Sequence, residues 1–204
     1  LVRQALCAVG QRLRAQLGVA LPSQIVTKKS LLLRARKEMG AQLLDAVKKQ
    51  LGIVPNLMRV VGNSAAALEG YLSLNGALGK GTIGAKTGER IALAVAELNG
   101  CSYCLSAHSY LGSNLAKLDA VEIDSNRHGT SSDSKAAAAV HFAAQIVRTR
   151  GHVSDAEVAA VKAAGYSNAE VIEIVLHVAL NTLTNYVNEV AKTEIDFPVI
   201  RPFG

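Results

Sequence analysis

The stretch that most constrains the fold of this chain lies at residues 89–108. Its first part, ERIALAVAEL at residues 89–98, is rich in alanine, leucine and valine and indicates a buried helix. The next two residues, Asn99 and Gly100, are a strong turn signal that lets the chain reverse direction. The sequence CSYCLSAH follows at residues 101–108. We therefore predict a helical hairpin whose two arms lie side by side.

Two cysteines and a histidine in the second arm have the spacing of one helix face. Side chains three or four residues apart lie on the same side of a helix, so Cys101, Cys104 and His108 would form a single line. A thiol is nucleophilic as the thiolate, and a nearby base or a helix N-terminus lowers its pKa. If a peroxide oxidised one cysteine to a sulfenic acid, the other would be placed to condense with it into a disulfide. The pattern therefore indicates redox chemistry.

The two cysteines are activated by different features. Cys101 lies where the second helix would begin, and a helix dipole stabilises a charge at its end by about 0.3 to 1 kcal/mol. Cys104 lies one turn from His108, and a cationic histidine paired with a thiol can lower the thiol pKa by several units. We therefore predict that Cys104 is the attacking thiol.

Two glutamates of the first arm are candidates for orienting His108. Residues equally far from the turn lie side by side in a hairpin, so Glu89 would come near the level of His108 and Glu97 near the cysteines. A carboxylate beside the imidazole fixes its tautomer and raises its basicity. Alternatively, Glu89 only complements the dipole of a helix opened by Thr87 and Gly88. The spacing favours Glu89 over Glu97 for the role beside the histidine.

At these residues the chain resembles the alkylhydroperoxidase D and carboxymuconolactone decarboxylase family, in its peroxidase-related branch. Glu89, Cys101, Cys104 and His108 match the family signature E-x11-C-x-x-C-x-x-x-H, and the similarity covers most of the chain after the first forty residues. The resemblance implies that Cys104 attacks a hydroperoxide, that His108 and Glu89 relay its proton, and that Cys101 resolves the sulfenate. It also implies a homo-oligomer, a trimer or hexamer, and a lipoyl-bearing or thioredoxin-like dithiol reductant.

The sequence departs from this family at one position of the motif. The alkylhydroperoxidase D proteins proper carry a second histidine between the cysteines, where this chain has Tyr103. The decarboxylase members lack the paired cysteines, so the chain does not resemble them at the site.

The composition is that of an all-α multi-helix bundle. Half of the 204 residues are apolar and only 4% are aromatic, and residues that favour strands rarely alternate with polar ones. No apolar run approaches the roughly 20 residues that cross a bilayer, so we expect a soluble protein without a membrane partner. Three cysteines, with Cys7 far from the other two, do not form a disulfide framework. We expect Cys7 to be inert and the compartment to be reducing, with a cytoplasmic location and organelle targeting left open.

The net charge of +6 comes from one end of the chain. Residues 1–37 carry eight basic side chains and no acidic one, whereas the remainder carries 14 basic and 16 acidic side chains. No aromatic or motif pattern of a nucleic-acid-binding domain accompanies the charge, so we expect no nucleic-acid partner. Residues 1–37 are interpreted as a basic N-terminal extension. It is a targeting or appended segment, or a helix lying on an oligomer surface.

Residues 38–204 are predicted to form the alkylhydroperoxidase D-like helical domain. Its catalytic half would span about 38–126 and its C-terminal half about 134–196, with a polar loop at 127–133 between them. The glycine-rich loop at 79–84 lacks the residue order of a phosphate-binding loop. The segment 196–200 should cover an apolar patch in extended form.

Two capping boxes mark the starts of the last two helices. Each places a serine three residues before a glutamate, Ser154 with Glu157 and Ser167 with Glu170. The second box opens the longest predicted helix, which is unusually rich in asparagine and threonine. Its polar side chains either bond across a subunit interface, which we favour, or line the floor of the redox pocket; they include Asn181, Thr182, Thr184, Asn185, Tyr186 and Asn188. His177 of the same helix is expected to be a packed, partnered histidine.

Three functions compete for the C-x-x-C motif. The first is a thiol peroxidase of antioxidant defence, in which Cys104 and Cys101 cycle between dithiol and disulfide and an external dithiol restores them. The second is a zinc site made by Cys101, Cys104, His108 and either Glu97 or Glu89. Structural zinc sites usually bring two ligand pairs from separate segments, and no second pair is visible. The third is a diverged decarboxylase-like protein. We favour the peroxidase and expect no cofactor and no metal.

Overall fold

The computed structural model describes residues 40–49 and 52–203 of the chain. The basic segment 1–37, with Cys7, lies outside the described residues. Within the described part every regular element is a helix, which confirms the all-α prediction. None of the helices described is both long and apolar enough to cross a membrane.

The helices follow one another through short connections. Residues 40–49 are helical, and the further helices are α3 (Asn56–Val61), α4 (Ala65–Leu78), α5 (Ala85–Leu98), α6 (Ser102–Asn114), α7 (Ala120–Arg127), α8 (Ser134–Thr149), α9 (Asp155–Ala163) and α10 (Asn168–Ala191).

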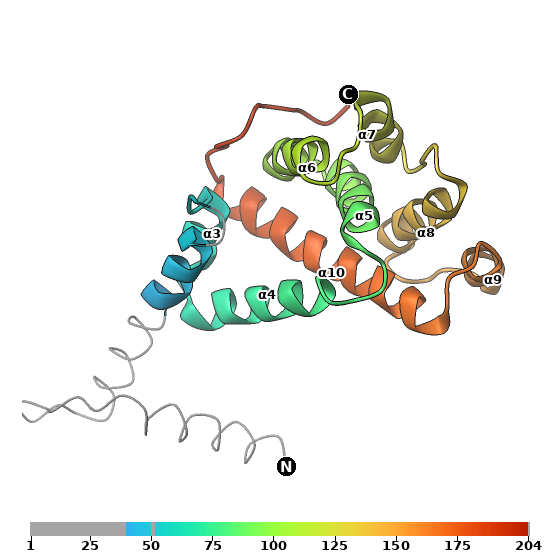
Figure 1. Ribbon diagram of the computed structural model, residues 1–204, viewed down its shortest axis with the longest axis horizontal. Helices are drawn as coiled ribbons and strands as arrows, with labels where there is room; N and C mark the ends of the chain where they lie inside the picture. Colours follow the sequence, from blue (N-terminus) through green and yellow to red (C-terminus); the bar gives the residue numbers. More distant parts are fainter. Residues whose placement is uncertain (1–39, 50–51, 204) are drawn as a thin grey trace, which may run out of the picture. The chain divides into compact units, whose positions relative to one another are not determined.

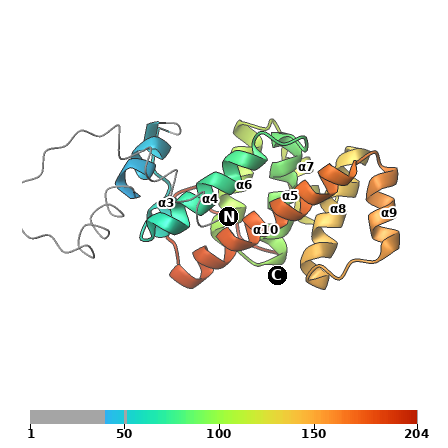
Figure 2. The same cartoon turned by 90° about the horizontal axis from the view of Figure 1, so that it is seen from below.

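Helix α5 is the centre of this arrangement. It packs against α6, α7, α8 and α10, and its residues 91–96 are almost completely buried. A helix that is apolar on all sides can be stable only when other helices enclose it. In Figure 1, α5 lies between α6 and α8, and the long α10 crosses from α9 to α3. Figure 2 shows α8 and α9 at one end of the arrangement and α3 at the other.

The predicted hairpin of α5 and α6 is present. Asn99 ends α5, Gly100 has a positive φ of 68°, and Cys101 caps the N-terminus of α6. A positive φ favours glycine, which explains why the turn uses this residue. One detail of the prediction was wrong: α5 begins at Ala85, so Glu89 is its fifth residue and lies beyond the first turn. The helix dipole therefore does not account for Glu89.

A buried carboxylate fastens α7 to α5. Glu122 pairs with Arg90 at 2.7 Å, with both side chains less than one-tenth exposed. Burial raises the pKa of Glu122, but hydrogen bonds from Ser131, Ser132 and Asn126 outweigh it and hold the pKa well below its usual range. These bonds order the polar loop between α7 and α8.

The segment after α10 is not helical and covers an apolar patch, as predicted, and the structure shows that this patch includes α6. The hydroxyl of Tyr103 donates to Asp196 Oδ1 at 2.8 Å, and Ser106 Oγ accepts the backbone N–H of Ile200 at 2.9 Å. The apolar side chains of Ile195, Phe197 and Ile200 pack against the buried cluster that contains both cysteines of the motif. The segment thus holds the outer side of the helix that carries the cysteines.

The capping boxes and the glycine-rich loop have the local structure that their sequences predict. Both capping boxes are formed, and the longest helix begins where the second box predicts. In the loop at 79–84, the carboxylate of Glu173 accepts the backbone N–H groups of Thr82 and Ile83. Those groups are not available to a phosphate.

Candidate functional site

The two cysteines of the motif lie in contact at the start of α6. Cys101 Sγ accepts the backbone N–H of Cys104 at 3.3 Å, so the side chain itself caps the helix. The Cys101 thiol donates to Cys104 Sγ across 2.8 Å, and no disulfide joins them. Both residues are buried. The pair is therefore a reduced dithiol whose sulfurs are close enough to form a disulfide after a small change.

Glu89 and His108 form the pair that the hairpin predicted. His108 Nδ1 lies 2.9 Å from Glu89 Oε2, and about a fifth of each side chain is exposed. Burial lowers the pKa of His108, but the carboxylate of Glu89 outweighs it, with smaller contributions from Cys104 and Asn181, and the net pKa is raised. The imidazole is thus held toward its cationic form at neutral pH.

The two thiols differ strongly in acidity. The hydrogen bond from Cys101 is the largest influence on Cys104; with the charge of His108 and the amides of Asn188 and Asn185 it overcomes burial and lowers the pKa of Cys104 to about 6. The same hydrogen bond, together with burial, raises the pKa of Cys101. At pH 7 the favoured state is a Cys104 thiolate that accepts a hydrogen bond from the Cys101 thiol.

Asparagines of α10 complete the surroundings of Cys104. Asn188 Nδ2 donates to Cys104 Sγ at 3.2 Å, and Asn185 Oδ1 accepts from Asn99 Nδ2 at 2.8 Å. Asn181, Asn185 and Asn188 are all buried. For these three asparagines the favoured interface interpretation was wrong, because they line the floor beneath the dithiol. Their four- and three-residue spacing, one helix face, is the signal that could have indicated this.

Two tyrosines near the site have different environments. Tyr71 of α4 was interpreted only as part of an apolar stripe, yet burial, with the charges of Cys104 and Glu89, raises its pKa to about 12. Tyr103, at the position of the family's second histidine, donates to Asp196 and accepts the backbone N–H of Leu57. Its hydroxyl therefore joins α3 to the segment after α10.

Glu97 is not part of the site. Its carboxylate pairs with Arg127 at 2.7 Å and accepts the backbone N–H of Phe203. It is thus not available as a fourth zinc ligand. In residues 40–49 and 52–203, no group of three or more histidine, cysteine or acidic side chains has a metal-binding arrangement.

His177 packs against the start of α5. Its Cε1 atom would lie 3.0 Å from a Cβ atom added to Gly88, so the glycine makes room for the ring. Burial lowers the pKa of His177, and the charges of Glu173 and Glu89 oppose this only in part. The ring is therefore held neutral and packed, as predicted, but it is only partly buried, and no hydrogen bond to its nitrogens is found among the described residues.

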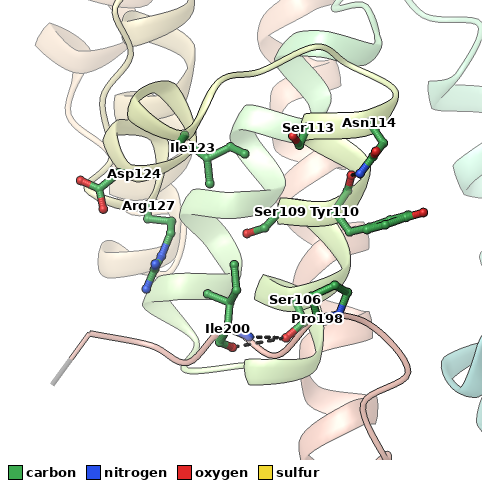
Figure 3. A pocket seen from close by; sticks show the side chains of 11 residues that line it. Ser106, Ser109, Tyr110, Ser113, Asn114, Ile123, Asp124, Arg127, Pro198 and Ile200 are labelled. Carbon is green, nitrogen blue, oxygen red and sulfur yellow. Dashed lines mark hydrogen bonds between the residues drawn. The ribbon is translucent and has the colours of Figure 1, made fainter.

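A cavity of about 400 Å³ lies on the other side of α6. Ser106, Ser109 and Tyr110 of α6 line it, and Figure 3 shows Ile123 of α7 and Ile200 on the side toward which Ser109 points. These positions of α6 are turned away from Cys104 and His108. The cavity is separate from the dithiol, and no motif in the sequence predicts it.

Comparisons with known proteins agree with this geometry. Residues 65–145, which include the whole motif, match the model of the carboxymuconolactone decarboxylase family. No curated protein sequence matches the chain.

Solved structures share the fold at low sequence identity. A peroxidase-related protein from Ralstonia eutropha JMP134, with an alkylhydroperoxidase AhpD core, has a TM-score of 0.71 at 19% identity and covers 87% of this chain and 94% of its own. A peroxidase-related protein from Silicibacter sp. TM1040 has a TM-score of 0.68 at 19% identity, and the match covers 86% of this chain and 90% of that protein. The debrominase Bmp8, in complex with 2,3,4-tribromopyrrole, has a TM-score of 0.64 at 18% identity, and the match covers 76% of this chain and 84% of Bmp8. The resemblance to the carboxymuconolactone decarboxylase family is confirmed over residues 65–145, and the solved structures show the same fold.

Proposed function

We propose that the chain is a thiol-dependent peroxidase of the alkylhydroperoxidase type, and the match of residues 65–145 to the carboxymuconolactone decarboxylase family supports this proposal. The observation that carries this proposal is the contact between Cys101 and Cys104 at 2.8 Å, one helical turn from the Glu89–His108 pair. A thiolate attacks a peroxide, a second thiol can close a disulfide with the resulting sulfenic acid, and a cationic imidazole can donate the proton that the leaving group takes.

The first step oxidises Cys104. Its thiolate attacks the terminal oxygen of a hydroperoxide ROOH, so that an S–O bond forms and the O–O bond breaks. The leaving RO⁻ takes a proton from the His108 imidazolium and becomes the alcohol ROH. Glu89 acts on this step through His108, because it stabilises the cation that donates the proton.

The second step closes the disulfide. The sulfur of Cys101 attacks the sulfenic acid of Cys104, the S–S bond forms, and the oxygen leaves as water with the proton of Cys101. An external dithiol, carried by a lipoyl group or a thioredoxin-like protein, then reduces the disulfide by exchange and is itself oxidised. The cycle uses no cofactor.

Exposed apolar side chains on α10 support assembly into a homo-oligomer. The most exposed of them are Ile172, Leu183, Tyr186 and Val190. Their spacing along α10 places them on one side of the helix, and an exposed apolar helix face usually marks an interaction site. A trimer or a hexamer is the proposed assembly, and light scattering of the intact protein tests it.

Counting thiols tests the peroxidase proposal. One equivalent of a hydroperoxide should remove two thiols per chain from the reduced protein and leave Cys7 free. The variant Cys104→Ser is the control and should lose none at this dose. Loss of one thiol or none in the unmodified protein would refute the paired mechanism.

Two parallel measurements separate the competing functions. One zinc ion per chain, with thiols protected until a chelator is added, would favour the metal site. Thiol loss with 2,3,4-tribromopyrrole but not with a hydroperoxide would instead indicate the reductive dehalogenation for which Bmp8 is named.

A further inference from the structure

Two polar atoms beside the dithiol are buried without a hydrogen-bond partner in the described part of the chain. They are Asn185 Nδ2, a donor, and Asn188 Oδ1, an acceptor. The exposed fractions of the two residues are 0% and 3%. Buried amide groups are nearly always paired, because an unpaired one has lost its water without compensation. An unpaired donor and an unpaired acceptor on the same helix face therefore call for a ligand that offers both.

Hydrogen bonds orient both amides. Asn99 Nδ2 donates to Asn185 Oδ1 at 2.8 Å, which leaves the nitrogen of Asn185 as its free end. Asn188 Nδ2 donates to Cys104 Sγ at 3.2 Å, which leaves the oxygen of Asn188 as its free end. The amides of Asn188 and Asn185 both lower the pKa of the Cys104 thiol, and of the two only Asn188 Nδ2 makes a hydrogen bond to its sulfur in the described part of the chain. The free groups therefore belong to residues that already face the reacting sulfur.

The substrate of the proposed function has matching groups. A hydroperoxide carries one O–H donor and two oxygen acceptors, and a sulfenic acid likewise carries one O–H and an oxygen. A disulfide offers no donor. The unpaired groups thus suit the oxygen-bearing states of the cycle rather than the closed disulfide.

We propose that Asn185 and Asn188 form an amide cradle that holds the Cys104 thiolate and the terminal oxygen of the hydroperoxide. Asn188 Nδ2 holds the sulfur, Asn188 Oδ1 accepts the peroxide O–H, and Asn185 Nδ2 donates to the oxygen under attack. The cradle places that oxygen in line with the sulfur and stabilises the charge that develops on the oxygens as the O–O bond breaks. This inference rests on the proposed peroxidase function and adds two residues that contact the reacting atoms.

Two assays on the intact reduced protein separate the two parts of the cradle. Alkylation by iodoacetamide, followed against pH, gives the pKa of Cys104 and the intrinsic reactivity of its thiolate. Stopped-flow oxidation by a hydroperoxide, at a pH where each variant is fully ionised, gives the peroxide rate constant. The ratio of the two rate constants reports peroxide binding alone.

The variants Asn185→Leu and Asn188→Leu keep the shape of the side chain and remove the amide. We expect both to raise the Cys104 pKa and to lower the ratio of peroxide to alkylation rate by about tenfold or more, the size of a lost hydrogen bond to a developing charge. Thr184→Val is the matched control. It removes a buried hydroxyl of α10 that donates to the backbone carbonyl of Asn181, and it should change neither quantity. Asn188→Asp, which has the same size, replaces Asn188→Leu if the latter does not fold, and it should raise the pKa further.

An unchanged pKa, or an unchanged ratio in variants that fold, would overturn the cradle and leave the asparagines a packing role. A different result would refute the proposed function instead. If the unmodified protein does not react with any hydroperoxide, the peroxidase proposal and the oxygen-binding part of the cradle both fail, and the alkylation pKa alone decides the thiolate-binding part.

Discussion

Replacing Glu89 with glutamine tests the link between the hairpin and the acidity of Cys104. The carboxylate lies 2.9 Å from His108 Nδ1, and both side chains are more than three-quarters buried. Glutamine keeps the size and one hydrogen bond but removes the negative charge. The change therefore acts on the charge of His108 and leaves the packing of α5 against α6 nearly intact.

The expected size follows from the ion pair. An opposite charge at this distance shifts a pKa by about 1 to 3 units, or about 1.4 to 4 kcal/mol. Without it, burial is the largest influence on His108 and only the smaller contributions of Cys104 and Asn181 oppose it, so the pKa of His108 should fall below its ordinary value of about 6.5. The imidazole is then neutral at pH 7, and the Cys104 pKa, now about 6, should rise. Peroxide oxidation at pH 6 to 7 should slow accordingly.

Two titrations measure this prediction. The Cε1–H resonance of His108 gives the histidine pKa by NMR, and the pH dependence of alkylation gives the thiol pKa. Glu97→Gln is the matched control, because it removes a carboxylate of the same helix that pairs with Arg127 instead. If Glu89→Gln and Glu97→Gln leave the Cys104 pKa equally unchanged, the carboxylate beside His108 does not activate the thiol.

The same pair makes a pH-dependent contribution to stability. Because the pKa of His108 is raised in the folded state, its contribution is fully present below the unfolded value of about 6.5. It is lost as the pH rises through the folded value. In Glu89→Gln this decline should disappear from the pH profile of the unfolding free energy.

Three further predictions concern the cysteines, the buried ion pair and the basic segment. Cys104→Ser should form no sulfenic acid with one equivalent of peroxide, whereas Cys101→Ser should form it and over-oxidise, as seen by dimedone labelling and mass spectrometry; the reverse pattern would make Cys101 the attacking thiol. Glu122→Gln leaves the Arg90 charge buried without a counter-charge and should lower the unfolding free energy by about 3 to 5 kcal/mol in urea titrations, so a loss under about 1 kcal/mol would contradict the buried pair. Deletion of residues 1–37 should leave peroxide turnover and the melting temperature nearly unchanged, and a collapse in oligomer size would identify the segment as an assembly element instead.

Local sequence patterns predicted much of the fold. The Asn99–Gly100 turn, the two capping boxes and the asparagine-rich helix each depend on neighbours within a few residues, and all are present. The Glu89–His108 pair was also within reach of the sequence, because the hairpin fixes which residues of α5 face which residues of α6.

The features of the site that could not be predicted depend on how helices far apart in the chain pack and are rotated about their axes. Glu97 was placed near the cysteines, but Arg127 of α7 takes its carboxylate, and no local signal shows that α7 packs there. The asparagines of α10 were predicted to lie at a subunit interface, because the sequence does not show which face of their helix packs against α6. Tyr71 stands in an apolar stripe, and only the packing of α4 brings it close to Glu89 and Cys104.

The segment after α10 bears on the order in which the molecule is assembled during synthesis. Its hydrogen bonds to α6 join Tyr103 to Asp196 and Ser106 to Ile200, pairs separated by 93 and 94 positions. Closing so long a loop costs conformational entropy before the contact can stabilise the structure, so such contacts form late. On the ribosome, the outer side of α6 therefore stays uncovered until residues 196–203 have left the exit tunnel. Until then the thiols of a nascent chain lack the cover of Phe197 and Ile200.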